Sequence, residues 1–172
     1  MAYGESQGIK LNRKDLEKSR KKTCNKWFET QDSIGYWEDF SQQKIVWKRI
    51  GSILRFSYDN KGCLCLDSTC FASGKHIEYL VAVLNSKMGH YLLREAPKTG
   101  TGDLLISVQA VEPLKIPILN DESEFYTLGN EILRKQNNHQ ETLDLEEKLD
   151  HKIYKLYALS DEEVMFVQNG CF

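Results

Sequence analysis

The sequence of 172 residues has none of the short motifs that mark common catalytic and nucleotide-binding sites. It contains no Gly-x-Gly-x-x-Gly fingerprint, no P-loop, no Gly-x-Ser-x-Gly elbow and no His-Glu-x-x-His metal helix. Its four histidines are dispersed, and His76 and His90, both in one predicted helix, would lie about 21 Å apart along its axis. That separation is too large for one metal ion. The sequence therefore predicts no active site within this chain.

Long apolar runs are also missing, and no stretch approaches the ~18 apolar residues of a transmembrane helix. The first residues, MAYGESQG, lack the apolar core of a signal peptide. Without such a peptide, the odd count of 5 cysteines fits reduced thiols in the cytoplasm. The spacing of Cys63, Cys65 and Cys70 is not one that zinc sites use, and it suits one face of a short strand instead. We therefore expect a cytoplasmic protein with no metal site and no contact with a membrane.

Charge is distributed unevenly along a chain whose net charge is only −2. Residues 1–119 hold 18 Lys/Arg against 13 Asp/Glu, which is +5, and residues 120–172 hold 5 against 12, which is −7. A basic body with an acidic C-terminal segment is compatible with nucleic-acid binding by the body alone. A solvated acidic helix explains the C-terminal charge equally well.

The hydrophobic pattern predicts an α+β fold. Residues 43–58 alternate and read as two strands, and "CLCL" and "TCFA" within 63–72 give one or two more. A helical period over 75–94 predicts one helix, and "LLISVQAV" at 104–111 reads as a strand. Residues 112–119 are expected to be extended, because two prolines disfavour a helix.

The acidic C-terminal segment is expected to be helical. Residues 121–157 carry apolar residues at helical spacing and form one long helix or a broken pair. Ser160 with Glu163 forms a capping box that begins a further short helix. We therefore expect a small mixed or antiparallel sheet with one packed helix, followed by a C-terminal helical segment. The predicted divisions are a basic arm over 1–26, a central domain over 27–119 and the helical segment over 120–172.

Two stretches have the composition of a binding surface. The segment 33–50 places Tyr36, Trp37 and Phe40 close to basic residues, and rings of this kind can stack on bases or pack a loop onto a sheet. The loop "PKTGTGD" at 97–103 combines two glycines, which allow close approach to a ligand, with two hydroxyls and a cation. Turn glycines are common, and composition alone favours a plain connector from helix to strand over a binding loop here.

The order of these features resembles the C-terminal target-recognition domain of bifunctional type IIG restriction–modification enzymes. The likeness covers roughly residues 27–165. It is carried by an aromatic segment leading into a Lys-Ile-Val strand, a Tyr-Asp turn and hairpin, a helix with Leu-Asn-Ser-Lys, a Pro-rich exit, and a closing helix with a capped helix after it, at 27–50, 56–73, 76–93, 111–119 and 149–164.

The resemblance implies a sequence-specific domain that binds double-stranded DNA and positions a target adenine for a methyltransferase. The methyltransferase and endonuclease domains would belong to the parent polypeptide, with S-adenosylmethionine and Mg bound there and no cofactor in this chain. This chain alone would not be an enzyme. The residues proposed to contact DNA are Lys44, Lys48, Arg49, Arg55, Lys98, Thr99 and Thr101. The basic stretch from Lys14 to Lys26 would add non-specific phosphate contacts.

A second hypothesis assigns the chain to a different class. The amphipathic segment 123–157 suits a specificity or interaction module that docks a methyltransferase through its C-terminal helices and binds DNA only in that complex. A structural module without a nucleic-acid role is a third possibility. The steepness of the salt dependence of DNA binding separates the first hypothesis from the others.

Overall fold

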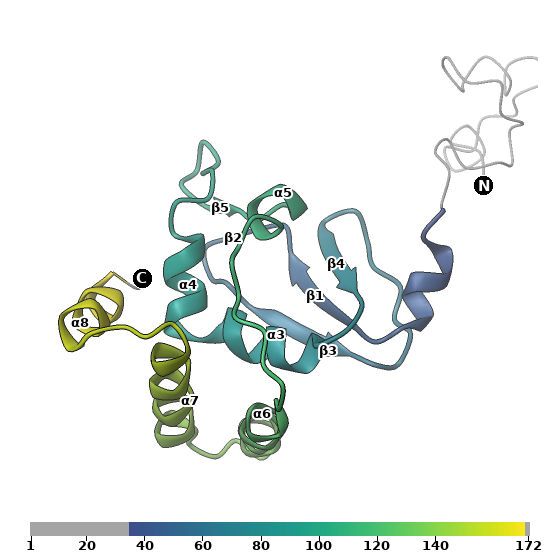
Figure 1. The fold of residues 1–172 in the computed structure, drawn as a ribbon. Helices are drawn as coiled ribbons and strands as arrows, with labels where there is room; N and C mark the ends of the chain where they lie inside the picture. The colour runs from purple at the N-terminus through teal and green to yellow at the C-terminus, as the bar shows by residue number, and fades with distance from the viewer. Residues whose placement is uncertain (1–34, 171–172) are drawn as a thin grey trace, which may run out of the picture. The chain divides into compact units, whose positions relative to one another are not determined.

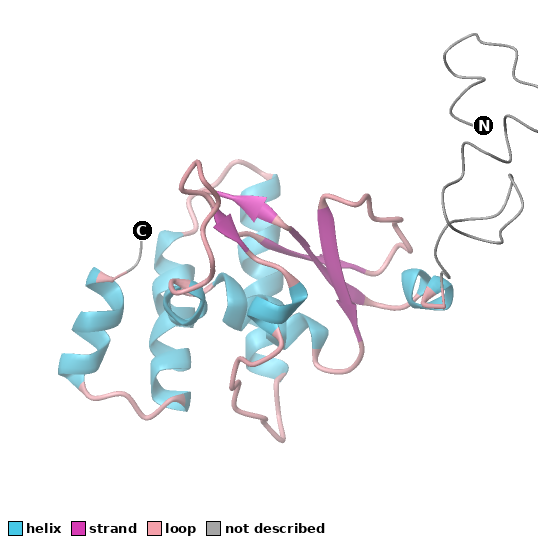
Figure 2. Cartoon of the chain, turned by 90° about the horizontal axis from the view of Figure 1, so that it is seen from above, coloured by secondary structure: helices cyan, strands magenta, loops and turns pink. Residues whose placement is uncertain are grey.

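A computed structural model describes residues 35–170 of the chain. The chain divides into two units, Met1–Glu38 and Asp39–Phe172, and the elements from β1 onward belong to the second. The expected basic arm lies outside the described residues. In chain order (Figures 1 and 2) the elements are η1 (Trp37–Ser41), β1 (Lys44–Lys48), β2 (Ile50–Gly51), β3 (Phe56–Asp59), β4 (Thr69–Ser73), α3 (Ile77–Asn85), α4 (Lys87–Leu93), β5 (Leu104–Leu105), α5 (Val108–Val111), α6 (Ser123–Asn137), α7 (Leu143–Leu156) and α8 (Asp161–Asn169).

The main sheet has three antiparallel strands in the order β3-β1-β4, which confirms the predicted α+β class. Alternation along the central strand points Ile45 and Trp47 to the same face, where both are buried. The Trp47 indole N–H donates a hydrogen bond to the Ile106 carbonyl at 2.8 Å. On the segment before β1, Phe40 stacks on Phe71 with ring centroids 4.7 Å apart. Packing of this segment onto the sheet is thus confirmed for Phe40.

The predicted helix over 75–94 is two helices, α3 and α4, joined at Ser86. The Ser86 hydroxyl donates to the Val83 carbonyl at 2.6 Å and accepts from the Gly89 N–H at 3.2 Å. It therefore satisfies backbone groups at the end of one helix and the beginning of the next. Hydrophobic periodicity missed the break because apolar residues continue on both sides of it.

The Leu-Asn-Ser-Lys sequence at 84–87 forms a structural junction. The Asn85 side-chain amide accepts from the Phe56 N–H at 2.9 Å and donates to the Phe56 carbonyl at 2.7 Å. Both backbone groups of Phe56 on the outer edge of β3 are therefore satisfied, and no further strand can pair at this residue. On the other side of Ser86, the Lys87 N–H donates to the buried Asp150 carboxylate of α7 at 2.9 Å. Burial raises the pKa of Asp150, and Lys87 opposes that shift. This short segment thus links the sheet edge, two helices and the C-terminal helical pair.

Two predictions of further strands have different outcomes. One strand, β4, forms within 63–72, where one or two were expected, and "CLCL" at 63–66 is not part of it. The expected strand at 104–111 is a two-residue strand, β5, followed by the short helix α5. β5 pairs with Ile50 and Gly51 of β2, and its Leu104 also forms an isolated bridge with Lys98.

The helix α3 is buried on two sides, between the sheet and the helices α6 and α7 (Figure 1). Ile77 and Leu84 pack with the sheet residues, while Tyr79, Ala82 and Val83 pack with the C-terminal helices. The segment 121–157 is the broken pair, α6 and α7, and the capping box of Ser160 and Glu163 begins α8 as predicted. The segment 114–119 pairs with no strand in the part of the chain that the structure describes.

Candidate nucleic-acid interface

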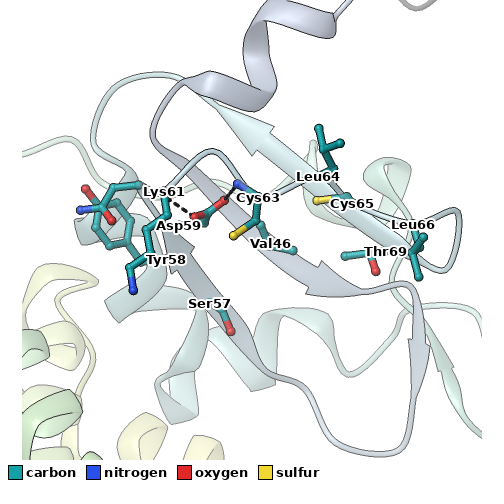
Figure 3. Close-up of a pocket in the computed structure, with 11 residues that line it drawn as sticks. Val46, Ser57, Tyr58, Asp59, Lys61, Cys63, Leu64, Cys65, Leu66 and Thr69 are labelled. Carbon is teal, nitrogen blue, oxygen red and sulfur yellow. Dashed lines mark hydrogen bonds between the residues drawn. The ribbon is translucent and has the colours of Figure 1, made fainter.

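Lys44 is a correction to the predicted set of DNA contacts. Its side chain is 0% exposed, and its Nζ lies 2.5 Å from Asp59 Oδ2 and donates to the Phe40 carbonyl at 2.7 Å. The carboxylate of Asp59 also accepts from the N–H groups of Lys61 and Cys63 (Figure 3). Lys44 and Asp59 are directly opposite each other in the β1–β3 register. The amine therefore stabilises the interior and is not available to a phosphate.

The loop 97–103 is the turn of a small hairpin. Lys98 forms a bridge with Leu104, the Leu105 N–H donates to the Pro97 carbonyl at 2.7 Å, and the Thr99 N–H donates to the Asp103 carbonyl at 2.8 Å. Gly102 has a φ of 88°, a conformation that favours glycine. These contacts hold the residues 97–105 as a short two-stranded ribbon that follows α4 after a turn at 94–96 and ends in β5.

The hairpin is joined to the end of β1 by the pairing of β2 with β5. Ile50 is opposite Leu105 and Gly51 is opposite Leu104, and the Ile106 N–H donates to the Arg49 carbonyl at 2.8 Å. Figure 1 shows β2 and β5 side by side, with the turn of the hairpin beyond them. The tertiary fold therefore brings Lys48 and Arg49 to the same end of the molecule as the 97–103 turn.

The basic side chains at this end are exposed. Lys48 and Arg49 are both in the exposed class, and the stem of Lys48 runs beside Gly51, the residue that pairs with β5. Arg49 lies close enough to the Cys70 thiol to lower its pKa, although burial of the thiol outweighs this and raises the pKa. Lys98 is also exposed. We call Lys48, Arg49 and the hairpin 97–105 the hairpin end.

Arg55 occupies a different position from the hairpin end. It lines a groove of 820 Å³ together with residues from β3, α3, α6 and α7. The same groove contains acidic residues, among them Glu78, Glu146 and Glu147. A phosphate in this groove would meet carboxylates as well as Arg55, so the surroundings favour the hairpin end as the cationic surface.

A comparison with known protein families gives one match that spans most of the chain. Residues 6–118 match the TaqI-like C-terminal specificity domain. The chain belongs to this family. No match was found among the curated proteins. The matched range contains the main sheet, α3, α4 and the whole hairpin end, whereas α6, α7 and α8 follow it.

Membership of the specificity-domain family indicates a role in DNA recognition within a restriction–modification enzyme. A specificity domain is not itself catalytic. Over residues 35–170, no group of three or more His, Cys, Asp or Glu side chains is arranged to hold a metal ion. The thiols of Cys63, Cys65 and Cys70 are free. The helices in this range are too short or too polar to cross a membrane.

Proposed function

We propose that the hairpin end reads a specific sequence in duplex DNA as the target-recognition domain of a type IIG restriction–modification enzyme. The observation that carries the proposal is the pairing of β2 with β5, which fixes a two-stranded ribbon beside Lys48 and Arg49. The major groove of B-DNA admits a two-stranded β-ribbon, and all four base pairs are distinguishable there. Lys48, Arg49 and Lys98 then contact phosphates or guanine, while Thr99 and Thr101 face base edges.

The wider role is part of the same proposal, and membership of a specificity-domain family supports it. By fixing the register on DNA, the domain positions a target adenine for a methyltransferase domain, which takes the base out of the stack for the reaction. The methyltransferase and endonuclease domains, with S-adenosylmethionine and Mg, belong to other parts of the enzyme. The contribution of this chain is the choice of site, made by groups on the hairpin and by the cations beside it.

The salt dependence of DNA binding tests this proposal. The full chain is titrated into a fluorescent pool of random-sequence duplexes, and anisotropy is measured at several salt concentrations. If the three cations of the hairpin end each neutralise a phosphate, affinity falls about 40-fold between ~50 and ~200 mM salt. Arg49→Glu and Lys98→Glu are each expected to weaken binding and to reduce the salt slope by about 1.

Lys148→Glu is the matched control, because it reverses an exposed charge on α7, outside the family match. It should leave affinity and salt slope unchanged. Absence of binding at 50 mM salt, or affinity that does not respond to salt, would contradict direct DNA binding by this chain. Equal effects of the three reversals would mean that the hairpin end is not the contact surface.

The alternative function is docking of a methyltransferase through the C-terminal helices. One observation favours it: α8 exposes Met165 and Phe166, at 62% and 60%, beside the acidic residues of its first turn. In that case the chain binds DNA only in the presence of the methyltransferase. The titration distinguishes the two functions when it is repeated with and without that partner.

A further inference from the structure

We propose that the turn of the hairpin reads an exocyclic amino group on a DNA base, with Thr99 and Asp103 as the accepting side chains. This inference rests on the proposed function and deepens it, since it assigns to named residues the chemical group that they recognise. Three side chains, Thr99, Thr101 and Asp103, lie at alternate positions of the turn and form one hydrogen-bonded series.

The direction of each hydrogen bond in this series follows from the number of protons available. Thr101 Oγ1 donates to Asp103 Oδ2 at 3.0 Å, and it also lies 2.8 Å from Thr99 Oγ1. A hydroxyl has one proton, and the proton of Thr101 is already given to the carboxylate. Thr99 must therefore be the donor in its contact with Thr101. Both hydroxyl protons are used within the turn.

What the turn presents to a ligand is consequently a set of acceptors. The Thr99 oxygen retains lone pairs, and an ionised carboxylate accepts at both oxygens and donates at neither. In the major groove the donors are the N4 amino group of cytosine and the N6 amino group of adenine, while guanine and thymine present acceptors. We therefore expect adenine or cytosine over guanine or thymine at one position of the contacted strand.

The turn is also rigid and open to a duplex. The Thr99 N–H donates to the Asp103 carbonyl, and the Gly102 N–H donates to the Thr99 carbonyl at 2.9 Å, so the backbone holds the series in place. A Cβ atom placed on Gly100 or Gly102 would meet no heavy atom within 4 Å. Open space on that side lets DNA approach, and a fixed array of acceptors discriminates better than a mobile one because little ordering is needed on binding.

The test is selection of bound duplexes from a random library by the full chain, followed by sequencing, for the wild type and two variants. The wild type should show one position at which adenine or cytosine is favoured by about 5-fold to 150-fold, the range of a good base contact. Asp103→Asn replaces an acceptor oxygen by an amide that also donates, so this preference should drop at least 5-fold there.

Thr101→Val acts by a different route. It removes the oxygen that accepts the Thr99 hydroxyl proton, so Thr99 can donate to guanine or thymine. These two bases should therefore become more frequent at the same position of the selected duplexes. Thr127→Val is the matched control, because Thr127 is an exposed threonine on α6 whose hydroxyl donates to the Ser123 carbonyl. Its selected sequences should equal those of the wild type.

The outcomes separate the inference from the proposed function. Selection of a defined site by the wild type, with unchanged base preferences in both Asp103→Asn and Thr101→Val, overturns the inference and leaves DNA recognition standing. Failure of the wild type to select or bind any duplex overturns DNA recognition by this chain, and the inference falls with it. A change at one position in both variants, with the other positions retained, supports both.

Discussion

Asp59→Ala is expected to lower the free energy of unfolding by about 3–5 kcal/mol, the usual cost of leaving a buried charge without its partner. Lys44 is 0% exposed, and its Nζ has two contacts here. One is the negatively charged Asp59 carboxylate, and the second is the neutral carbonyl of Phe40. The N–H groups of Lys61 and Cys63 that also bond Asp59 are exposed and can turn to water. Urea unfolding followed by circular dichroism measures the loss.

A double variant separates the effect of losing the Lys44–Asp59 ion pair from that of losing the hydrogen bonds between Asp59 and the turn that follows it. Lys44→Met with Asp59→Leu removes both charges and should recover most of the stability, because apolar side chains of similar volume often replace a buried ion pair without cost. If Asp59→Ala instead costs less than about 1 kcal/mol, as an exposed ion pair would, Lys44 is accessible to solvent and becomes a candidate for DNA contact again.

The same pair gives an expected acid dependence. The hydrogen bond from Lys44 lowers the pKa of Asp59 from 3.8 to about 2. A carboxyl group whose pKa is lower in the folded state stabilises the fold above its unfolded pKa, and this contribution disappears as the pH falls. We therefore expect a loss of stability between about pH 4 and pH 2 that Asp59→Asn lacks. Unfolding in urea at a series of pH values measures it, and parallel curves for the two proteins would contradict the assignment.

Gly89→Ala is the second substitution with a large expected effect, about 3 kcal/mol or more of lost stability. A Cβ at this position would lie 2.3 Å from the Val83 carbonyl oxygen and 2.6 Å from Leu84 atoms, all of them backbone. The backbone cannot move aside as a flexible side chain does, so the α3–α4 junction must shift. For a chain of this size the melting temperature should fall by about 6–12 °C.

Gly129→Ala is the matched control for this substitution. Gly129 is within the helix α6, and a Cβ there would meet nothing within 4 Å. Alanine is the better helix former, so stability should rise by about 0.5–1 kcal/mol. Equal and small effects of the two substitutions would mean that α3 and α4 are not packed as closely as Gly89 implies.

Local patterns in the sequence predicted a large part of the fold correctly. Alternation gave β1 with Ile45 and Trp47 on one face, and the Ser160–Glu163 spacing gave the N-terminus of α8. Gly62, in the turn that follows β3, has a φ of 74°, a conformation that favours glycine. These features depend on residues that are close in the chain, and their physical causes, side-chain alternation and capping, act over that short range.

The departures from the sequence prediction share a different cause. Residues 63–66 have the composition of a strand, but they pair with no strand of the main sheet and instead line a pocket with Val46 and Ser57. Periodicity continued across Ser86, although the helix ends there through side-chain bonds to the backbone. In the first case the surrounding elements decided the outcome, and in the second the hydrogen bonds of one side chain did; composition reveals neither.

For the candidate interface, the sequence by itself determined which chemical groups are present: basic residues at the end of β1 and a turn with two threonines, an aspartate and two glycines. Only the tertiary structure decided which of them act together. Pairing of Ile50 and Gly51 with β5 places the hairpin next to Lys48 and Arg49. Lys44, at the other end of β1, is instead paired with Asp59 across the strands and is buried. The reason is that exposure and proximity depend on contacts between residues distant in sequence, and those contacts exist only once the chain has folded.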